Sequence, residues 1–304
     1  EPFTQRKIEK PPYLPESTGL TSLTVLAPRV RFSGSLVESV QLADFEKLLL
    51  AVEKAAGVEN ETTFHRTGFV VETFQLSSDD PSANLLKSLG EIPSVSGHER
   101  PVREAILAAL PAWARSRART DNEGNLIVEV GPDRDPLMFI AHQDEVGFEV
   151  TNIATDGTVS LRTRGGLFQS LWEGQPALLH FDRPGEPPLR GVFVPRETAT
   201  NKQPEALTAW FGYDGDELKR RGVTNGLSVT GFKHAMRLGV TRFTARALDD
   251  RAGSTALVLA VRRIVPAALK RKVIFAWSVR EETGLEGARA LARQYGSSVK
   301  RVYS

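Results

Sequence analysis

The chain has 304 residues, of which 40% are hydrophobic and 25% are charged, with 39 lysines and arginines against 37 aspartates and glutamates. A chain of this length can bury a large core, and it is long enough for two domains or for one domain with an insertion. The net charge of +2 gives no general reason to bind nucleic acid or a membrane, and the absence of cysteine restricts any metal site to imidazole and carboxylate ligands.

The sequence contains no apolar stretch of the length that a membrane-spanning helix needs, and no signal-peptide pattern. We therefore expect a cytoplasmic protein without a membrane partner. Secretion or a periplasmic location stays open, because the chain begins with Glu1 rather than Met.

Residues 1–80 are expected to form an N-terminal segment with a proline-rich, extended start. Residues 21–40 have a β-rich composition, and a short strand is expected over residues 68–74. Between them, residues 44–56 place four apolar side chains on one helical stripe before a glycine suited to end the helix: Phe45, Leu48, Leu49 and Val52, then Gly57. We expect this helix to pack on a sheet.

Residues 81–147 are expected to form the first part of an α/β domain. A short helix is predicted over residues 84–89, and the spacing of Ser96 and Glu99 is that of a capping box at the start of a second helix. A strand over residues 126–130 follows. Alternation of helices and strands is typical of an α/β fold.

The stretch that carries the first chemical signal is Pro136 to Gly147. Residues 137–141 are apolar without alternation, which predicts a strand covered on both faces, as in a parallel sheet. Ligands collect at the carboxyl ends of such strands, where the sequence places His142, Asp144 and Glu145. Because residues i and i+2 of an extended segment share a side, Asp144 is expected to orient the imidazole of His142 for metal binding.

Residues 148–242 differ in character, because they consist of short β-like pieces broken by glycine turns such as Gly165-Gly166. They predict a small β domain. The helical pattern resumes at Ala252, so we expect this β domain to be inserted into the α/β domain, which residues 243–304 complete.

Two acidic pairs add to the signal at His142. Asp249 and Asp250 immediately precede a predicted helix, where either could simply cap the helix, and Glu281 and Glu282 follow the apolar strand at residues 273–279. Together they favour a metallohydrolase in which one carboxylate bridges two divalent ions and a glutamate takes a proton from metal-bound water. The alternative is that each pair lies in a surface turn. The flanking arginines, Arg251 and Arg280, are expected to pair with these acids.

Four motifs in this order resemble the di-zinc aminopeptidases of the glutamyl aminopeptidase and tetrahedral (TET) group. They are Ile-Pro-Ser-Val-Ser-Gly-His-Glu (92–99), Ala-His-Gln-Asp-Glu-Val-Gly-Phe (141–148), Ala-Leu-Asp-Asp-Arg-Ala-Gly (247–253) and Glu-Glu-Thr-Gly-Leu-Glu-Gly-Ala (281–288). The resemblance covers about residues 83–304. One departure is Gln143, where the family often has methionine.

The resemblance implies a role for each matching residue. His142 is expected to bind one metal, Asp249 to bridge both, Glu282 to bind the other, Glu281 to act as general base and Asp144 to orient His142. The implied cofactors are two divalent ions, zinc in the first place, with cobalt or manganese as alternatives. The implied partners are a peptide substrate and further copies of the chain, assembled through the inserted domain, which is PDZ-like in the family.

The resemblance also shows a gap, because the family has a further aspartate ligand and a final histidine ligand, and this chain contains neither residue type after Glu282. Residues 31–48 resemble the family's closing segment, so residues 21–57 are expected to correspond to its last strand and helix. Gly34 occupies the position of the histidine. Circular permutation, a cut through tandem copies and chance similarity all stay open.

We therefore expect an α/β fold with a mainly parallel sheet flanked by helices, an inserted β-barrel or PDZ-like domain, and aminopeptidase activity. Three alternatives stay open: a metal-poor pseudoenzyme for assembly, a peptide-binding module, and a related metal-dependent deacylase or amidase. The four remaining histidines lack metal-ligand spacing and are expected to be structural: His65, His98, His180 and His234.

Overall fold

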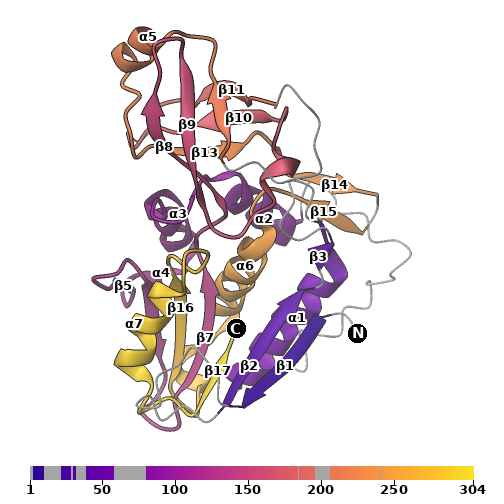
Figure 1. Ribbon diagram of the computed structural model, residues 1–304. Coiled ribbons are helices and arrows are strands. Elements are labelled where there is room, and N and C mark those ends of the chain that lie inside the picture. The colour runs from indigo at the N-terminus through magenta and orange to yellow at the C-terminus, as the bar shows by residue number, and fades with distance from the viewer. Residues whose placement is uncertain are drawn as a thin grey trace.

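The computed structural model describes residues 3–9, 22–28, 30–31, 39–57, 80–183, 185–195, 206–239 and 241–304, with side chains described from Ala43 onward except at a few positions such as Phe45. The expected strand at 68–74, the proline-rich start, Gly34 and His65 lie outside the described residues. The described chain forms an α/β body and a β-barrel that stands on one end of it (Figure 1).

The helices are α1 (Leu42–Ala56), α2 (Pro81–Glu91), α3 (Arg100–Ala109), α4 (Ala112–Arg115), α5 (Gly215–Arg220), α6 (Leu248–Arg263) and α7 (Glu286–Tyr295), with short 3-10 turns at Gln169–Leu171 and Pro266–Ala268. The strands of the body are β1 (Phe3–Glu9), β2 (Ser22–Pro28), β5 (Arg119–Thr120), β6 (Leu126–Val130), β7 (Leu137–His142), β16 (Val273–Ser278) and β17 (Arg301–Tyr303). None of the described helices has both the length and the apolarity needed to span a membrane.

The seven strands of the body form one sheet in the order β1-β2-β17-β7-β16-β6-β5. The three pairs at its centre, β2 with β17, β17 with β7, and β7 with β16, are parallel. The outer pairs, β1 with β2, β16 with β6, and β6 with β5, are antiparallel. The expectation of a mainly parallel sheet is therefore corrected to a mixed sheet with a parallel centre and antiparallel strands at both edges.

Both faces of the sheet are covered, as the unbroken apolar run at 137–141 predicts. Along β7, Leu137, Phe139 and Ala141 join the larger core with α1, α2, α3 and α6, whereas Met138 joins a smaller core under α7. Adjacent residues of a strand point to opposite faces, so a strand without polar alternation needs a layer of helices on each side. The helices lie on the two sides of the sheet in Figure 1.

The segment that resembles the family's closing strand and helix lies in the body beside the last strand. β2 pairs in parallel with β17, and α1 packs on α6 with Leu48, Leu49 and Val52 buried in the larger core. The buried carboxylate of Glu53 receives a 2.9 Å hydrogen bond from Arg263 of α6.

The barrel contains β8 (Gly147–Ile153), β9 (Thr158–Arg164), β10 (Pro176–Leu179), β11 (Leu189–Phe193), β12 (Thr208–Trp210) and β13 (Ser228–Gly231), closed in the order β10-β11-β12-β9-β8-β13. Three aromatic side chains, Phe148, Trp172 and Phe193, fill its centre with ring centroids 5.0–5.4 Å apart. β14 (Met236–Leu238) and β15 (Arg242–Thr244) instead form a small sheet with β4 (Ser39–Gln41) and β3 (Val30–Arg31).

The predicted capping box at Ser96 and Glu99 is wrong. Glu99 directly precedes α3 but makes no side-chain cap of that helix. Its carboxylate instead accepts hydrogen bonds from the backbone N–H groups of Gly97 and Arg280, and Ser96 Oγ lies 2.9 Å from Thr283 Oγ1. The polar side chains of this segment therefore connect it to the loop after β16.

Replacing Leu49 by alanine tests whether α1 belongs to the core of the body. Leu49 is 2% exposed in the larger core, so we expect Leu49→Ala to lower the free energy of unfolding by about 2–4 kcal/mol in chemical denaturation. The exposed Lys54 on the same helix supplies the control Lys54→Ala, whose effect should be small. Equal effects of the two variants would contradict the packing of α1 on α6.

His180 at the end of β10 predicts an acid sensitivity of the barrel. Burial, with added repulsion from Arg246 and His98, lowers the pKa of His180 to about 3. As the pH falls below about 6.5, the unfolded chain takes up a proton that the folded chain refuses, so stability decreases by about 1–2 kcal/mol at pH 5.

We expect His180→Gln to reduce this loss between pH 7 and pH 5, as measured by urea unfolding at each pH. His234→Gln, at an exposed histidine, is the control for replacing a histidine at the surface. An unchanged pH dependence in His180→Gln would exclude the explanation.

Candidate functional site

The site forms where two neighbouring parallel strands end. His142 is the last residue of β7, and it is paired in register with Ser278, the last residue of β16. The chain leaves β16 through Val279 and Arg280 and reaches Glu281 and Glu282 directly. The carboxyl ends of parallel strands lie at one edge of the sheet, which brings the two motifs together although they are far apart in sequence.

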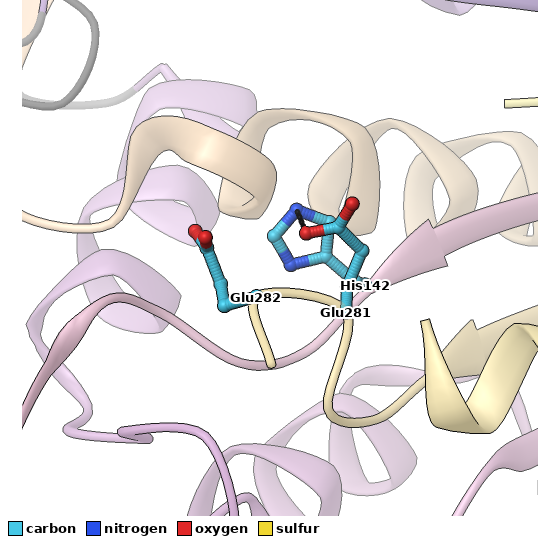
Figure 2. A group of neighbouring side chains, drawn as sticks. All are labelled: His142, Glu281 and Glu282. Carbon is cyan, nitrogen blue, oxygen red and sulfur yellow. Dashed lines mark ion pairs between the residues drawn. The ribbon is translucent and has the colours of Figure 1, made fainter. Parts of the chain in front are cut away.

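The structure places His142 between the two glutamates (Figure 2). Within the described residues, His142, Glu281 and Glu282 form a group in which one ligand atom from each lies within 4.8 Å of the others. His142 Nε2 lies 3.8 Å from Glu281 Oε2. The His142 side chain is only 11% exposed, whereas that of Glu281 is 36% exposed, so the group opens to solvent on the side of the glutamates.

Asp249 reaches the same imidazole from α6. Its Oδ1 lies 2.9 Å from His142 Nε2, and its side chain is 53% exposed. Asp249 is not a member of the three-residue group above, but it shares the His142 nitrogen with it. Ala247 adopts a left-handed φ of 55°, and both aspartates have non-helical backbone angles, so the regular helix begins after them.

The capping alternative applies to Asp250 rather than Asp249. Asp250 Oδ1 accepts a 2.8 Å hydrogen bond from the Gly253 N–H, three residues on, as an N-cap does. Its other oxygen accepts the backbone N–H of His142 at 3.3 Å, and Ser254 Oγ donates to the His142 carbonyl at 2.9 Å. The start of α6 therefore fixes the backbone of His142 on both sides.

Asp144 binds the loop that carries the glutamates. Its carboxylate is completely buried and accepts the backbone N–H groups of Glu281 and Glu282 at 3.0 and 3.1 Å. His142 Nδ1 lies 3.1 Å from the Asp144 carbonyl oxygen and 3.5 Å from its carboxylate. Asp144 therefore contacts His142 as the sequence suggests, and it also anchors both glutamates, which the sequence does not indicate.

Carboxyl groups outnumber positively charged or imidazole groups around His142. Burial, and repulsion from Asp249, Glu281 and Asp144, raise the pKa of Glu282 to about 8. Burial and the charge of Asp249 raise the pKa of Asp250 to about 7. Burial opposes a charge on His142, but hydrogen bonds to Asp144 and Asp249 outweigh it and raise the pKa of His142 well above its ordinary value. Clustered carboxylates of this kind require a cation or shared protons.

The donor set fits a divalent metal ion. It offers an imidazole nitrogen and carboxylate oxygens and no thiolate, which suits zinc in open, catalytic sites and also manganese or cobalt. His142, Glu281 and Glu282 converge within 4.8 Å, and Asp249 adds a fourth donor at the same imidazole. His142, Glu281 and Glu282 are therefore close enough to share an ion. Asp249, the third ligand selected from the sequence, is near His142 but is not within the same 4.8 Å group.

Glu99 is a part of the site that the sequence analysis missed. Its buried carboxylate accepts the Arg280 N–H at 3.0 Å, and Arg280 has a left-handed φ of 50°. Such a conformation is unfavourable for a residue with a side chain and needs support from its surroundings. Glu99 thus stabilises the turn that presents Glu281. The nearest signal in the sequence is the match of residues 92–99 to the family's opening motif.

The expectation that Arg251 and Arg280 pair with the neighbouring acidic motifs is wrong. Arg251 is fully buried and donates to the carbonyls of Leu89, Ile92 and Gln143 and to Ser94 Oγ. Arg280 pairs with Glu123 and Glu286 rather than with Glu281 or Glu282. Both arginines therefore make hydrogen bonds or ion pairs to the framework around the site.

The strand-end motif also holds a buried ion pair. Glu145 accepts hydrogen bonds from Arg246 at 2.6 and 3.2 Å, and both side chains are almost inaccessible. The Glu145 carboxylate further accepts the Ser94 N–H at 2.8 Å. Glu145 is thus engaged in structure rather than directed at His142.

Comparison with known proteins agrees with this geometry. A family model described as M42 glutamyl aminopeptidase matches residues 124–299, more than half of the chain. The glutamyl aminopeptidase of Lactococcus lactis subsp. cremoris (strain MG1363) is 27% identical over 224 residues, which are 69% of this chain and 62% of that protein. The chain spans 56% to 62% of the length of the curated relatives that it matches.

Solved structures give the same result. The TET1 peptidase of Pyrococcus horikoshii, described as able to assemble into a tetrahedron or a large octahedral shell, is 32% identical with a TM-score of 0.64, covering 70% of this chain and 66% of that one. Aminopeptidase APDkam598 from the archaeon Desulfurococcus kamchatkensis is 25% identical with a TM-score of 0.63, covering 69% and 59%. The chain described here therefore belongs to the M42 glutamyl aminopeptidase family.

Proposed function

We propose that this protein is a metal-dependent aminopeptidase, which removes residues from the N-termini of peptides. The observation that carries the proposal is the convergence of His142, Glu281 and Glu282 within 4.8 Å, with Asp249 at 2.9 Å from the same imidazole. Membership of the M42 glutamyl aminopeptidase family supports it.

We assign His142, Asp249 and Glu282 as the residues that hold the metal, with Asp249 in the bridging position between two ions. When bound, zinc supplies a Lewis acid that polarises the scissile carbonyl and lowers the pKa of water. His142 presents Nε2 to this position, because its Nδ1 faces the carbonyl oxygen of Asp144. The buried strand end that carries His142 keeps the imidazole fixed while the glutamate side stays open to substrate.

We assign Glu281 as the general base. Its carboxylate lies 3.8 Å from His142 Nε2, and 36% of its side chain is exposed, so it can reach both water and substrate. Burial and the charges of Asp144 and Asp249 raise the pKa of Glu281, which brings it closer to the range in which a carboxylate both accepts and returns a proton. Glu281 would take a proton from the attacking water and deliver it to the leaving amine.

We assign to Asp144 two positioning tasks. It contacts His142 Nδ1 through its carbonyl oxygen, and its carboxylate holds the backbone of Glu281 and Glu282. One side chain thereby sets the distance between the imidazole and the base. Its complete burial keeps these bonds out of competition with water.

We propose further that the chain forms homo-oligomers through the barrel. The TET1 peptidase relative is described as assembling into closed shells. On the barrel, Val192 and Trp210 are cross-strand neighbours that are 41% and 47% exposed, an unusual exposure for paired apolar side chains.

Replacing the proposed base separates catalysis from metal binding. We expect Glu281→Gln to reduce kcat on a peptide with a free N-terminus by about 100- to 10,000-fold, while bound zinc measured by mass spectrometry stays at the wild-type level. Glu104→Gln, at an exposed glutamate on α3, is the control. Unchanged turnover in Glu281→Gln would reject the role.

Removing a proposed ligand distinguishes the aminopeptidase from its rivals. We expect Asp249→Ala to weaken zinc binding by about 10- to 100-fold and to abolish release of the N-terminal residue. A metal-poor pseudoenzyme would show no zinc in the wild-type chain either. A peptide-binding module would keep its peptide affinity in Asp249→Ala, and a deacylase or amidase would cleave N-blocked substrates in preference to free amines.

A further inference from the structure

The barrel contacts the candidate metal centre through the Gly165-Gly166 turn, which directly follows β9. Gly165 has a left-handed φ of +90°. A Cβ atom built on it would lie 3.0 Å from Glu282 Cβ and 3.2 Å from Glu282 Oε2, and 2.9 Å from Val146 Cγ1. Distances this short leave no space for a side chain at residue 165.

This contact adds a second constraint to Glu282. The backbone N–H of Glu282 is held by Asp144 Oδ2 at 3.1 Å, which fixes where the side chain starts. The direction of the carboxylate depends on the side-chain rotamer. A Cβ at residue 165 would need the space that the Glu282 Cβ and one of its carboxylate oxygens occupy, so Glu282 can keep this side-chain rotamer because residue 165 has no side chain.

We propose that Gly165 is a positioning residue of the metal centre: its lack of a side chain leaves the space in which the Glu282 carboxylate lies near His142, so that metal affinity depends on this turn of the barrel. This inference rests on the proposed function, because it assigns Glu282 to the metal. It also gives the inserted barrel a direct part in the site, in addition to any part in assembly.

Two other glycines provide matched controls for a Gly165→Ala variant. Gly166, the next residue, has no left-handed φ, and a Cβ on it would meet no atom within 4 Å. Gly174, in the same barrel, has a left-handed φ of +72°, and a Cβ on it would also meet no atom within 4 Å. Gly174→Ala therefore reproduces the backbone strain of Gly165→Ala without the contact to Glu282, and Gly166→Ala reproduces neither.

The experiment measures the zinc affinity of the full chain with a competing chelator dye, together with Tm. We expect Gly165→Ala to weaken zinc binding by about 10- to 100-fold, the usual effect of disturbing the support of a metal ligand. Gly174→Ala and Gly166→Ala should bind zinc as the wild type does. Gly174→Ala should lose Tm from backbone strain alone, and Gly165→Ala should lose more because of its added contact with Val146. Equal zinc affinity in Gly165→Ala and Gly174→Ala would overturn the proposal.

A second variant keeps the test decisive if Gly165→Ala folds poorly. In Val146→Ala/Gly165→Ala the contact with Val146 Cγ1 is removed, so Tm should recover while zinc binding stays weak relative to Val146→Ala alone. Recovery of both would show that the glycine is required only for folding, and would reject the positioning role.

The outcome for the wild type separates this inference from the proposed function. If the wild-type chain neither binds zinc nor releases N-terminal residues, the proposed function and the role of Gly165 are both rejected. If the wild-type chain binds zinc and releases N-terminal residues, but Gly165→Ala behaves like Gly174→Ala, only the role of Gly165 is rejected.

Discussion

The site depends on one buried carboxylate that connects two strand ends. Asp144 follows β7, and its oxygens accept the N–H groups of the two glutamates that follow β16. Parallel pairing brings the strand ends to the same edge of the sheet, but it does not fix the positions of the loops that follow them. The two hydrogen bonds from the glutamate N–H groups to Asp144 fix those positions. Because Asp144 is completely buried, these bonds form without competition from water. The placing of the two glutamates relative to His142 follows from this connection.

A second layer of polar contacts surrounds this connection. Glu99 holds the strained turn at Arg280, Arg251 binds carbonyl oxygens around the strand end, and Glu145 is neutralised by Arg246. Among the described residues, these arginines make their hydrogen bonds to the framework, while Asp249, Glu281 and Glu282 gather around His142. Such an arrangement, with positive charge used only for the framework, is consistent with a centre built to bind a divalent cation.

The parts of this structure that could be predicted are those with a strong local pattern. The apolar run at 137–141 predicted a strand covered on both faces, which the two cores confirm, and the glycine-broken composition of 148–242 predicted β structure that the closed barrel confirms. The capping box at Ser96 and Glu99 failed, because a carboxylate three residues after a serine can bind any nearby N–H, and here the loop after β16 provides one. The contact between Gly165 and Glu282 could not be predicted, since it joins residues from two different layers that no sequence spacing relates.

The position of β2 has a consequence for how the protein comes to be folded. Residues 22–28 pair in parallel with residues 301–303, and α1 closes the face of α6. Contacts between residues far apart in sequence require a large loss of chain entropy before the favourable packing energy is gained, and this slows folding. During synthesis, residues 22–28 would leave the ribosome long before residues 301–303, so β2 would gain its parallel neighbour only after β17 had emerged.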